Sequence, residues 1–209
     1  MSSREATARS EDRLWRLIEQ RIQAGADTEA IDERIWELFG EEWCVMFTDL
    51  SGFSRRVESF GIIHFLQIIH EHKKLLTPII ESRCGVLVKM EADSLLVIFK
   101  RATSALRAAL EMQRACQQAN VRRVEEERML LCVGLGCGHI LRIGDDDVYG
   151  KEVNAASKLG EDIARANEIL VTDSFREAVI GEAKDFGITF EPLDVEVPGA
   201  KKSWRARYS

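Results

Sequence analysis

The order of the helices and strands that the sequence predicts is the feature that most restricts the fold of this chain. Apolar runs bounded by turn residues predict strands, and apolar residues recurring at steps of three and four predict helices. The predicted core elements are strand 43–49, helix 55–82, strands 86–91 and 94–99, helix 102–120 and strand 130–136. This β-α-β-β-α-β order is that of the split βαβ, ferredoxin-like arrangement. We therefore predict an α+β fold with a ferredoxin-like core.

Smaller elements are expected to follow this core. Residues 140–143 predict a short return strand, and residues 151–166 predict a helix. The spacing of Ser174 and Glu177 matches a capping box at the start of another short helix. Further strands are expected at 169–171, 190–197 and 203–208. The core is thus expected to carry extra C-terminal α and β elements.

Residues 1–40 are expected to form an N-terminal extension, and residues 41–209 the main domain. Apolar residues recur at helical spacing over residues 14–22 and again over residues 31–39. This pattern predicts two short amphipathic helices. Because exposed tryptophans are costly, we expect the helices to pack on the domain's own surface or on a partner copy. Carrying a signal is the remaining alternative.

Composition limits the class of protein. The 209 residues are 45% hydrophobic and carry a formal net charge of -6. A general nucleic-acid binder would need a basic face, so no nucleic-acid partner is expected. The apolar runs are far shorter than the ~20 residues that a membrane span needs, and the polar N-terminus is unlike a signal peptide. We therefore expect a cytoplasmic protein without a membrane span.

The cysteines are five in number, scattered along the chain and without CxxC spacing. Such a set predicts reduced thiols, mostly in the core, and neither a disulfide framework nor a zinc site. The residues concerned are Cys44, Cys84, Cys116, Cys132 and Cys137.

Two carboxylates are candidates for metal binding. The segment 45–54, VMFTDLSGFS, is an apolar strand that ends at Asp49 and continues into a glycine-containing turn. Such a turn before a helix can bind a metal and phosphates, although an Asp that merely caps the turn is the alternative. In a ferredoxin-like core the turn carrying Asp93 lies beside this strand end, so the two carboxylates should meet. Their repulsion would be relieved by protonation or by cations, and two Mg²⁺ ions with a triphosphate would serve.

Four blocks of sequence, in this order, resemble the catalytic domain of class III nucleotidyl cyclases. They are FTDLSGFS at 47–54, KMEAD at 89–93, DVYGKEVN at 147–154 and AASKL at 155–159. The resemblance covers about residues 43–208, so residues 41–209 are identified as a cyclase catalytic domain. It implies a homodimer with active sites at the subunit interface, and two Mg²⁺ or Mn²⁺ ions in each site.

The resemblance also implies a role for each matching residue. The reaction would be attack of the ribose 3′-oxygen on the α-phosphorus, with pyrophosphate leaving. The roles are metal binding by Asp49, Asp93 and the backbone of Leu50; phosphate binding by Ser51, Gly52, Phe53 and Ser54; base recognition by Lys89 and Asp147; ribose orientation by Asn154; and transition-state stabilisation by Lys158.

The base-recognising residues favour ATP as the substrate. A carboxylate at Asp147 accepts a hydrogen bond from an exocyclic amine, and a protonated Lys89 donates one to a ring nitrogen. Adenine offers this pair of groups, whereas guanine and uracil offer the reverse and would leave buried charges unpaired. Cytosine has the same order of groups as adenine, so CTP is the alternative substrate by this reasoning. A degenerate module that binds nucleotide without turnover is the other alternative.

Departures from the family pattern concern the groups that neutralise phosphate. Lys158 stands where the family usually has Arg. The lysine keeps the positive charge but lacks the planar guanidinium fork. Pro198 stands where the family often has a phosphate-binding Lys. Lys201 or Lys202 is then expected to reach the phosphates, unless this segment is a solvated turn. We expect activity to be retained but lower than that of an enzyme with Arg at position 158.

Overall fold

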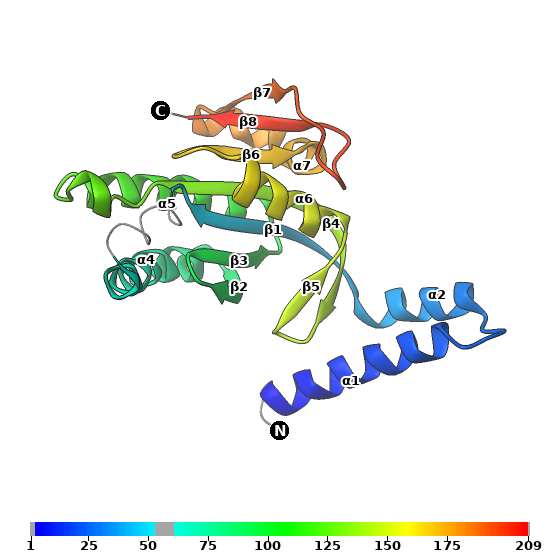
Figure 1. Ribbon diagram of the computed structural model, residues 1–209. Helices are drawn as coiled ribbons and strands as arrows, with labels where there is room; N and C mark the ends of the chain where they lie inside the picture. The colour runs from blue at the N-terminus through cyan, green and yellow to red at the C-terminus, as the bar shows by residue number, and fades with distance from the viewer. Residues whose placement is uncertain (1–2, 53–60, 209) are drawn as a thin grey trace.

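The computed structural model describes residues 3–52 and 61–208, with side chains from residue 10 onwards (Figure 1). Within these residues eight strands form one sheet in the order β2-β3-β1-β4-β6-β8-β7, with β5 paired to β4. The strands are β1 (Gly40–Leu50), β2 (Gly85–Glu91), β3 (Ser94–Phe99), β4 (Leu131–Ile143), β5 (Asp147–Tyr149), β6 (Ile169–Thr172), β7 (Thr189–Leu193) and β8 (Ser203–Arg207). The main helices are α1 (Ser3–Arg21), α2 (Thr28–Phe39), α4 (Ile62–Ser82), α5 (Ala102–Asn120), α6 (Lys151–Ser157) and α7 (Asp173–Ala183).

The ferredoxin-like core is confirmed. Strand β1 pairs antiparallel with β3 on one side and with β4 on the other, and β2 pairs with β3 at the edge. Helix α5 matches its predicted bounds of 102–120. Helix α4 begins at Ile62 rather than at residue 55, and residues 53–60 lie outside the described part of the chain. The first strand begins three residues earlier than predicted, at Gly40.

The two faces of the sheet have different covers. Met46 packs in the main core with α4, α5 and α7. Its neighbour Val45 points to the other face, into a cluster with Val153 and Ala156 of α6. Because side chains alternate along a strand, Asp49 lies on the same face as Val45, the face that α6 covers.

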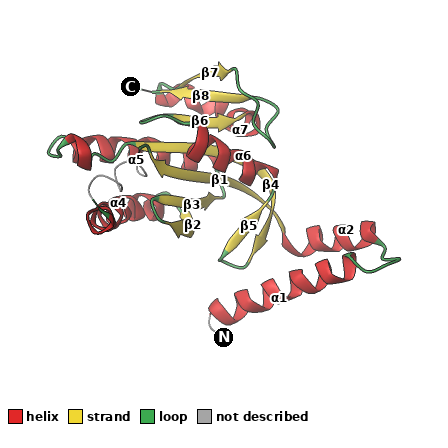
Figure 2. Ribbon diagram, in the orientation of Figure 1, coloured by secondary structure: helices red, strands yellow, loops and turns green. Residues whose placement is uncertain are grey.

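The N-terminal extension forms the two predicted helices, which lie at one end of the sheet beside the β4–β5 hairpin (Figure 2). The Asp27 side chain accepts a hydrogen bond from the backbone of Ala30 and caps α2. The helices pack on the chain's own domain through a cluster centred on Ile143 of β4. The buried members of this cluster are Leu14, Leu17, Ile35, Phe39 and Ile143.

Strand β4 corrects the prediction of two separate strands at 130–136 and 140–143. It is continuous from Leu131 to Ile143, and the return strand is β5. The glycines in its middle are not breaks, because a Cβ at Gly136 would lie 2.8 Å from the backbone oxygen of Glu152. They allow α6 to approach the strand closely.

Three features of the C-terminal elements also differ from the prediction: the end of one helix, the cap of another and the end of a strand. The helix expected at 151–166 is α-helical only to Ser157 and continues as a π-helical segment, Lys158–Ile163. The cap of α7 is Thr172, whose hydroxyl accepts from the Phe175 backbone, and not a box built on Ser174. Ser174 instead donates to the carboxylate of Glu152. Strand β7 ends at Leu193, four residues before the predicted end.

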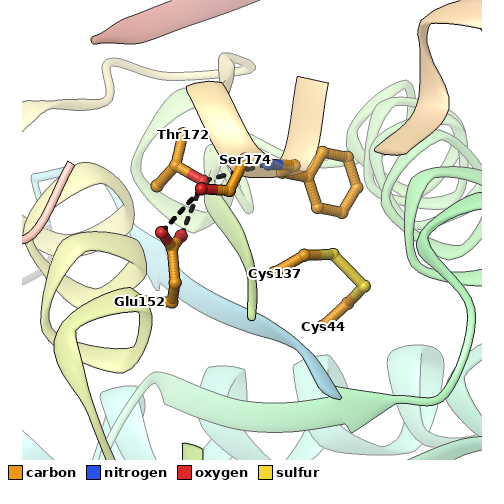
Figure 3. The surroundings of a disulfide bond; sticks show 6 residues. Cys44, Cys137, Glu152, Thr172 and Ser174 are labelled. Atoms are coloured by element: carbon orange, nitrogen blue, oxygen red, sulfur yellow. Dashed lines mark hydrogen bonds between the residues drawn. A yellow bond between two sulfur atoms is a disulfide. The ribbon is translucent and has the colours of Figure 1, made fainter. Parts of the chain in front are cut away.

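The prediction that the cysteines are reduced is wrong for one pair. Cys44 and Cys137 form a disulfide between β1 and β4, with their Cα atoms 4.0 Å apart (Figure 3). The two residues are direct partners in the register of the β1–β4 pairing, which places their side chains on one face. Cys84, Cys116 and Cys132 are free.

A membrane span was not expected. Among the residues that the structure describes, no helix has both the length and the apolar character to cross a bilayer.

Candidate active site

Asp49 and Asp93 lie together at one end of the sheet. Asp49 is near the end of β1, and Asp93 is in the turn between β2 and β3. The backbone N–H of Leu50 donates to the Asp93 carboxylate at 3.3 Å. The hydroxyl of Ser94 donates to the Asp49 carboxylate, also at 3.3 Å. The pairing of β1 with β3 thus produces the convergence that the predicted topology required.

The turn that carries Asp93 adopts a backbone conformation that normally favours glycine. Ala92, which stands where the resembling family has Gly, has a φ of 50°. A side chain in this left-handed region costs about 1 kcal/mol. The sequence departure at position 92 therefore leaves the turn geometry in place at a small cost in stability.

Both carboxylates bind protons more tightly than an ordinary aspartate does. Burial, together with the negative charge of Asp93, raises the pKa of Asp49 to about 7. The pKa of Asp93 is also raised, chiefly by burial. Ionising both of two carboxyl groups in contact costs electrostatic free energy. Near neutrality the pair therefore holds a proton or needs a cation.

The donor set of this pair fits a Mg²⁺ or Mn²⁺ ion bound partly by substrate. Within the described residues there is no group of three or more His, Cys, Asp or Glu side chains that would enclose a metal. Mg²⁺ is commonly held by only one or two carboxylates, with substrate phosphates and water as the other ligands. Asp49 and Asp93 therefore suit an ion that arrives with a triphosphate better than a permanently enclosed ion.

The turn after β1 gives only partial support to the predicted phosphate site. The backbone N–H of Ser51 donates to the carbonyl of Leu130 at 2.9 Å, so it is not available to a phosphate in this conformation. Gly52 has a φ of 77°, as expected for a turn glycine. Phe53 and Ser54, the other two predicted phosphate contacts, lie outside the described residues.

Lys89 and Asp147, the predicted base-recognising pair, lie next to each other although 58 positions separate them. The Lys89 ammonium is 3.4 Å from the Asp147 carboxylate and 3.3 Å from Glu91. Both carboxylates raise the pKa of Lys89; the hydrogen bond to Glu91 is the largest single cause, followed by the charge of Asp147. The second oxygen of Asp147 accepts from the backbone N–H of Val148 at 2.9 Å. The ammonium of Lys89 is thus held in its protonated form beside the Asp147 carboxylate.

The predicted ribose and transition-state residues follow on α6 and the π-helical segment. Asn154 is exposed on α6. Lys158 is half exposed and forms an ion pair with Asp162 at 2.7 Å. Lys201 is exposed in the turn before β8. That turn packs closely on the start of α6, because a Cβ at Gly199 would lie 2.3 Å from the backbone oxygen of Lys151.

The predicted residues therefore fall into separate groups in the single chain. Asp49 and Asp93 form one group, and Lys89 and Asp147 form a second. Within the described residues no hydrogen bond or ion pair joins the two groups.

Glu152 is a structural residue that the sequence analysis missed. Its side chain is only 2% exposed, and its carboxylate accepts from the hydroxyls of Thr172 at 2.8 Å and Ser174 at 2.9 Å (Figure 3). These contacts fix α6, which carries Asn154, against the start of α7. Its position inside the segment 147–154 was visible in the sequence, but its buried partners were not.

Comparison with known proteins gives a consistent result. Residues 39–206 match the family described as the adenylate and guanylate cyclase catalytic domain. A crystal structure described as an adenylate/guanylate cyclase/hydrolase, from Silicibacter pomeroyi, is similar with a TM-score of 0.66 and 26% identity. The match covers 80% of this chain and 96% of that one. The adenylyl cyclase CyaB from P. aeruginosa shares the fold, with a TM-score of 0.68 and 19% identity over 81% of this chain and 95% of that one.

One curated relative is a much longer protein. The serine/threonine-protein kinase pkn2 of Myxococcus xanthus is 29% identical over 130 residues, which are 62% of this chain. The match spans only 15% of the length of that kinase.

Proposed function

Because the chain belongs to the adenylate and guanylate cyclase catalytic domain family, we propose that it converts ATP into 3′,5′-cyclic AMP and pyrophosphate. The observation that carries this proposal is the convergence of Asp49 and Asp93, with the raised pKa of Asp49, at the end of β1. Such a pair is poised to exchange its proton for the divalent ions that accompany a nucleoside triphosphate.

The proposed chemistry assigns a role to each group. Two bound divalent ions would lower the pKa of the attacking hydroxyl and neutralise charge on the triphosphate. Asp49 and Asp93 would hold these ions and fix the position of the α-phosphate. Asn154 would orient the ribose so that its 3′-oxygen faces the phosphorus. Lys158 would stabilise the negative charge that develops in the transition state, once released from Asp162.

We also propose that the active form is a homodimer. The α6 face of the sheet is incompletely covered in one chain, since Phe47, Val86 and Val88 are only partly buried there. This apolar face adjoins both Asp49 and Lys89. A second copy packed on it would therefore bring Asp49 and Asp93 of one chain towards Lys89 and Asp147 of the other. The proposal accounts for the separation of the two groups in a single chain. The oligomeric state can be checked by sedimentation, with a charge introduced by Val88→Glu expected to favour the monomer.

ATP is preferred over the other nucleotides for the electrostatic reason already given. The Lys89–Asp147 pair offers one donor and one acceptor, both charged. CTP remains the second candidate because cytosine presents the same order of groups. The family itself includes both adenylate and guanylate cyclases, so the substrate must be measured directly.

A product assay tests the proposal. The purified protein is incubated with ATP, CTP, GTP or UTP and Mn²⁺, and the products are separated by chromatography. Cyclic AMP as the main product is the expected result. A different cyclic nucleotide would overturn the assignment of ATP, and no product from any nucleotide would favour the degenerate module.

Matched variants then test the metal pair. Asp49→Ala and Asp93→Ala should each lower the rate by at least about 100-fold, because each removes a carboxylate ligand. Asp12→Ala, at an exposed position on α1, removes the same charge away from the site and should retain the parent rate. Normal activity in either site variant would refute the metal assignment.

A further inference from the structure

The strand pair that carries Asp147 also forms the contact with the N-terminal helices. Asp147 is the register partner of Ile143 in the β4–β5 pairing. Ile143 is 3% exposed and packs against Leu14 and Ile35 of the helix pair α1–α2. The base-recognising carboxylate is therefore one cross-strand neighbour away from the cluster that holds the extension on the domain.

Tyr149, two residues further along β5, faces the same helices. It pairs with Leu141, and both residues line a cavity of about 460 Å³. Most of the remaining walls of this cavity come from α1 and α2, and include Trp15 and Trp36. Glu11 of α1 is close enough to contribute to a raised pKa of the Tyr149 phenol, behind the effects of burial and of Asp147.

The hydroxyl of Tyr149 contacts the base-recognising group directly. It donates to the Oδ2 atom of Asp147 at 3.3 Å, the same oxygen that Lys89 approaches at 3.4 Å. The other oxygen is occupied by the Val148 backbone N–H. Tyr149 and Lys89 therefore approach one carboxylate oxygen from two different strands, and together they fix the direction in which its remaining lone pairs point.

We propose that Tyr149 is a positioning residue for base recognition: its hydroxyl orients the Asp147 carboxylate, and its ring is held in turn by the N-terminal helix pair. This inference rests on the proposed cyclase function. It makes the extension part of the base site, since a displacement of α1 and α2 would move Tyr149 and with it the acceptor for the exocyclic amine.

The consequence is specific to the exocyclic amine of the substrate. A carboxylate that has lost one of its two side-chain donors is less well oriented for the amine of adenine. Ordering this carboxylate when the base binds then costs more free energy. The base does not react, so the loss should raise KM and leave kcat nearly unchanged. A substrate without the amine makes no hydrogen bond to Asp147, so its KM should not depend on the hydroxyl of Tyr149.

The test compares two substrates in two matched variants. Tyr149→Phe keeps the ring and removes only the hydroxyl. Tyr208→Phe makes the same change at the other tyrosine of the chain, whose hydroxyl donates to the Asn167 backbone. Each variant is assayed with ATP and with purine riboside triphosphate, which lacks the amine. Tyr149→Phe should raise KM for ATP about 3- to 10-fold and leave purine riboside triphosphate unaffected, whereas Tyr208→Phe should not change the ratio between the two substrates.

A third variant tests the link to the extension. Trp15→Ala removes one wall of the cavity that Tyr149 lines and should raise KM for ATP, again without affecting the substrate that lacks the amine. An equal rise for both substrates would show a purely structural role and refute the positioning role. No change in Trp15→Ala would refute the part played by the helices.

These outcomes are distinguishable from failure of the proposed function. If the parent protein forms no cyclic nucleotide from any triphosphate, the cyclase proposal fails and this inference fails with it. If the parent is active but Tyr149→Phe has the parent KM for ATP, only the role of Tyr149 is refuted.

Discussion

The raised pKa of Asp49 predicts how stability depends on pH in the absence of metal. A carboxyl group whose pKa is raised by folding binds its proton more tightly in the folded chain than in the unfolded chain. The penalty for ionising Asp49 is therefore absent below its ordinary pKa of 3.8 and grows until the pH exceeds about 7. Replacing the group by a neutral isostere should remove this penalty, so Asp49→Asn should stabilise the metal-free protein at alkaline pH and not in acid.

The magnitude follows from the size of the shift. A change from 3.8 to about 7 corresponds to about 4 kcal/mol at about 1.4 kcal/mol per pKa unit. Asp49 is only partly buried, so solvent screening reduces this figure, and we expect about 1–2 kcal/mol. The amide oxygen of Asn can still accept the hydrogen bond from Ser94, so the substitution should not destabilise the protein by removing this bond.

Urea unfolding in the presence of EDTA measures the effect. The parent and Asp49→Asn should have equal free energies of unfolding near pH 4, and the variant should be about 1–2 kcal/mol more stable at pH 8. The control is Asp12→Asn, at an exposed position on α1, which should follow the parent at every pH. An Asp49→Asn variant that is equally or less stable than the parent at pH 8 would refute the raised pKa of Asp49, which burial and the charge of Asp93 produce.

Three further changes have clear expected outcomes. Lys158→Arg should raise kcat, because a guanidinium fork contacts phosphate oxygens better than an ammonium; a variant no faster than the parent in the product assay would contradict this. Cys44→Ser should lower the free energy of unfolding by about 2–4 kcal/mol and abolish any change in melting temperature on adding a reductant, since the bond to Cys137 closes a long loop. Ala92→Gly should raise the free energy of unfolding by about 0.5–1 kcal/mol, because glycine adopts the positive φ without penalty; a less stable variant in urea unfolding would contradict this.

The core of the fold was predictable because hydrophobic periodicity and element order carry most of the topology. Helix α5 agrees with its predicted bounds, and the β-α-β-β-α-β order alone was enough to bring Asp49 and Asp93 together. Both residues lie at the ends of well-defined strands, where the topology determines which ends are neighbours. This part of the candidate site therefore needed no knowledge of side-chain packing.

The disulfide could not be predicted because it depends on register. Cys44 and Cys137 are 93 positions apart and face each other only because the β1–β4 pairing aligns them. A shift of one residue would place the two side chains on opposite faces of the sheet. Nothing in the local sequence fixes that alignment.

The contact between Lys89 and Asp147 was expected only from the resemblance to a known family. Strand β4 was predicted to break near its glycines, whereas it runs on to Ile143 and presents the β5 return strand to β2. The role of Glu152 could not be predicted for a related reason, since its partners are Thr172 at the end of β6 and Ser174 in the first turn of α7. Contacts of this kind arise from the path of a long strand, which periodicity does not describe.

Close packing at glycines connects the end of β1 near Asp49 with the π-helical segment that begins at Lys158, within one chain. A Cβ at Gly134 would lie 2.1 Å from the backbone oxygen of Ala156, and a Cβ at Gly160 would lie 2.8 Å from the backbone oxygen of Phe47. The π-helical segment that begins at Lys158 is therefore in backbone contact with β1 two residues before Asp49. Because closely packed backbones cannot slide independently, the strand end that carries Asp49 and the segment that carries Lys158 should move as one body. If the active form is the proposed dimer, we expect a motion that opens the site to occur between the two chains or in the β4–β5 hairpin, which the N-terminal helices contact.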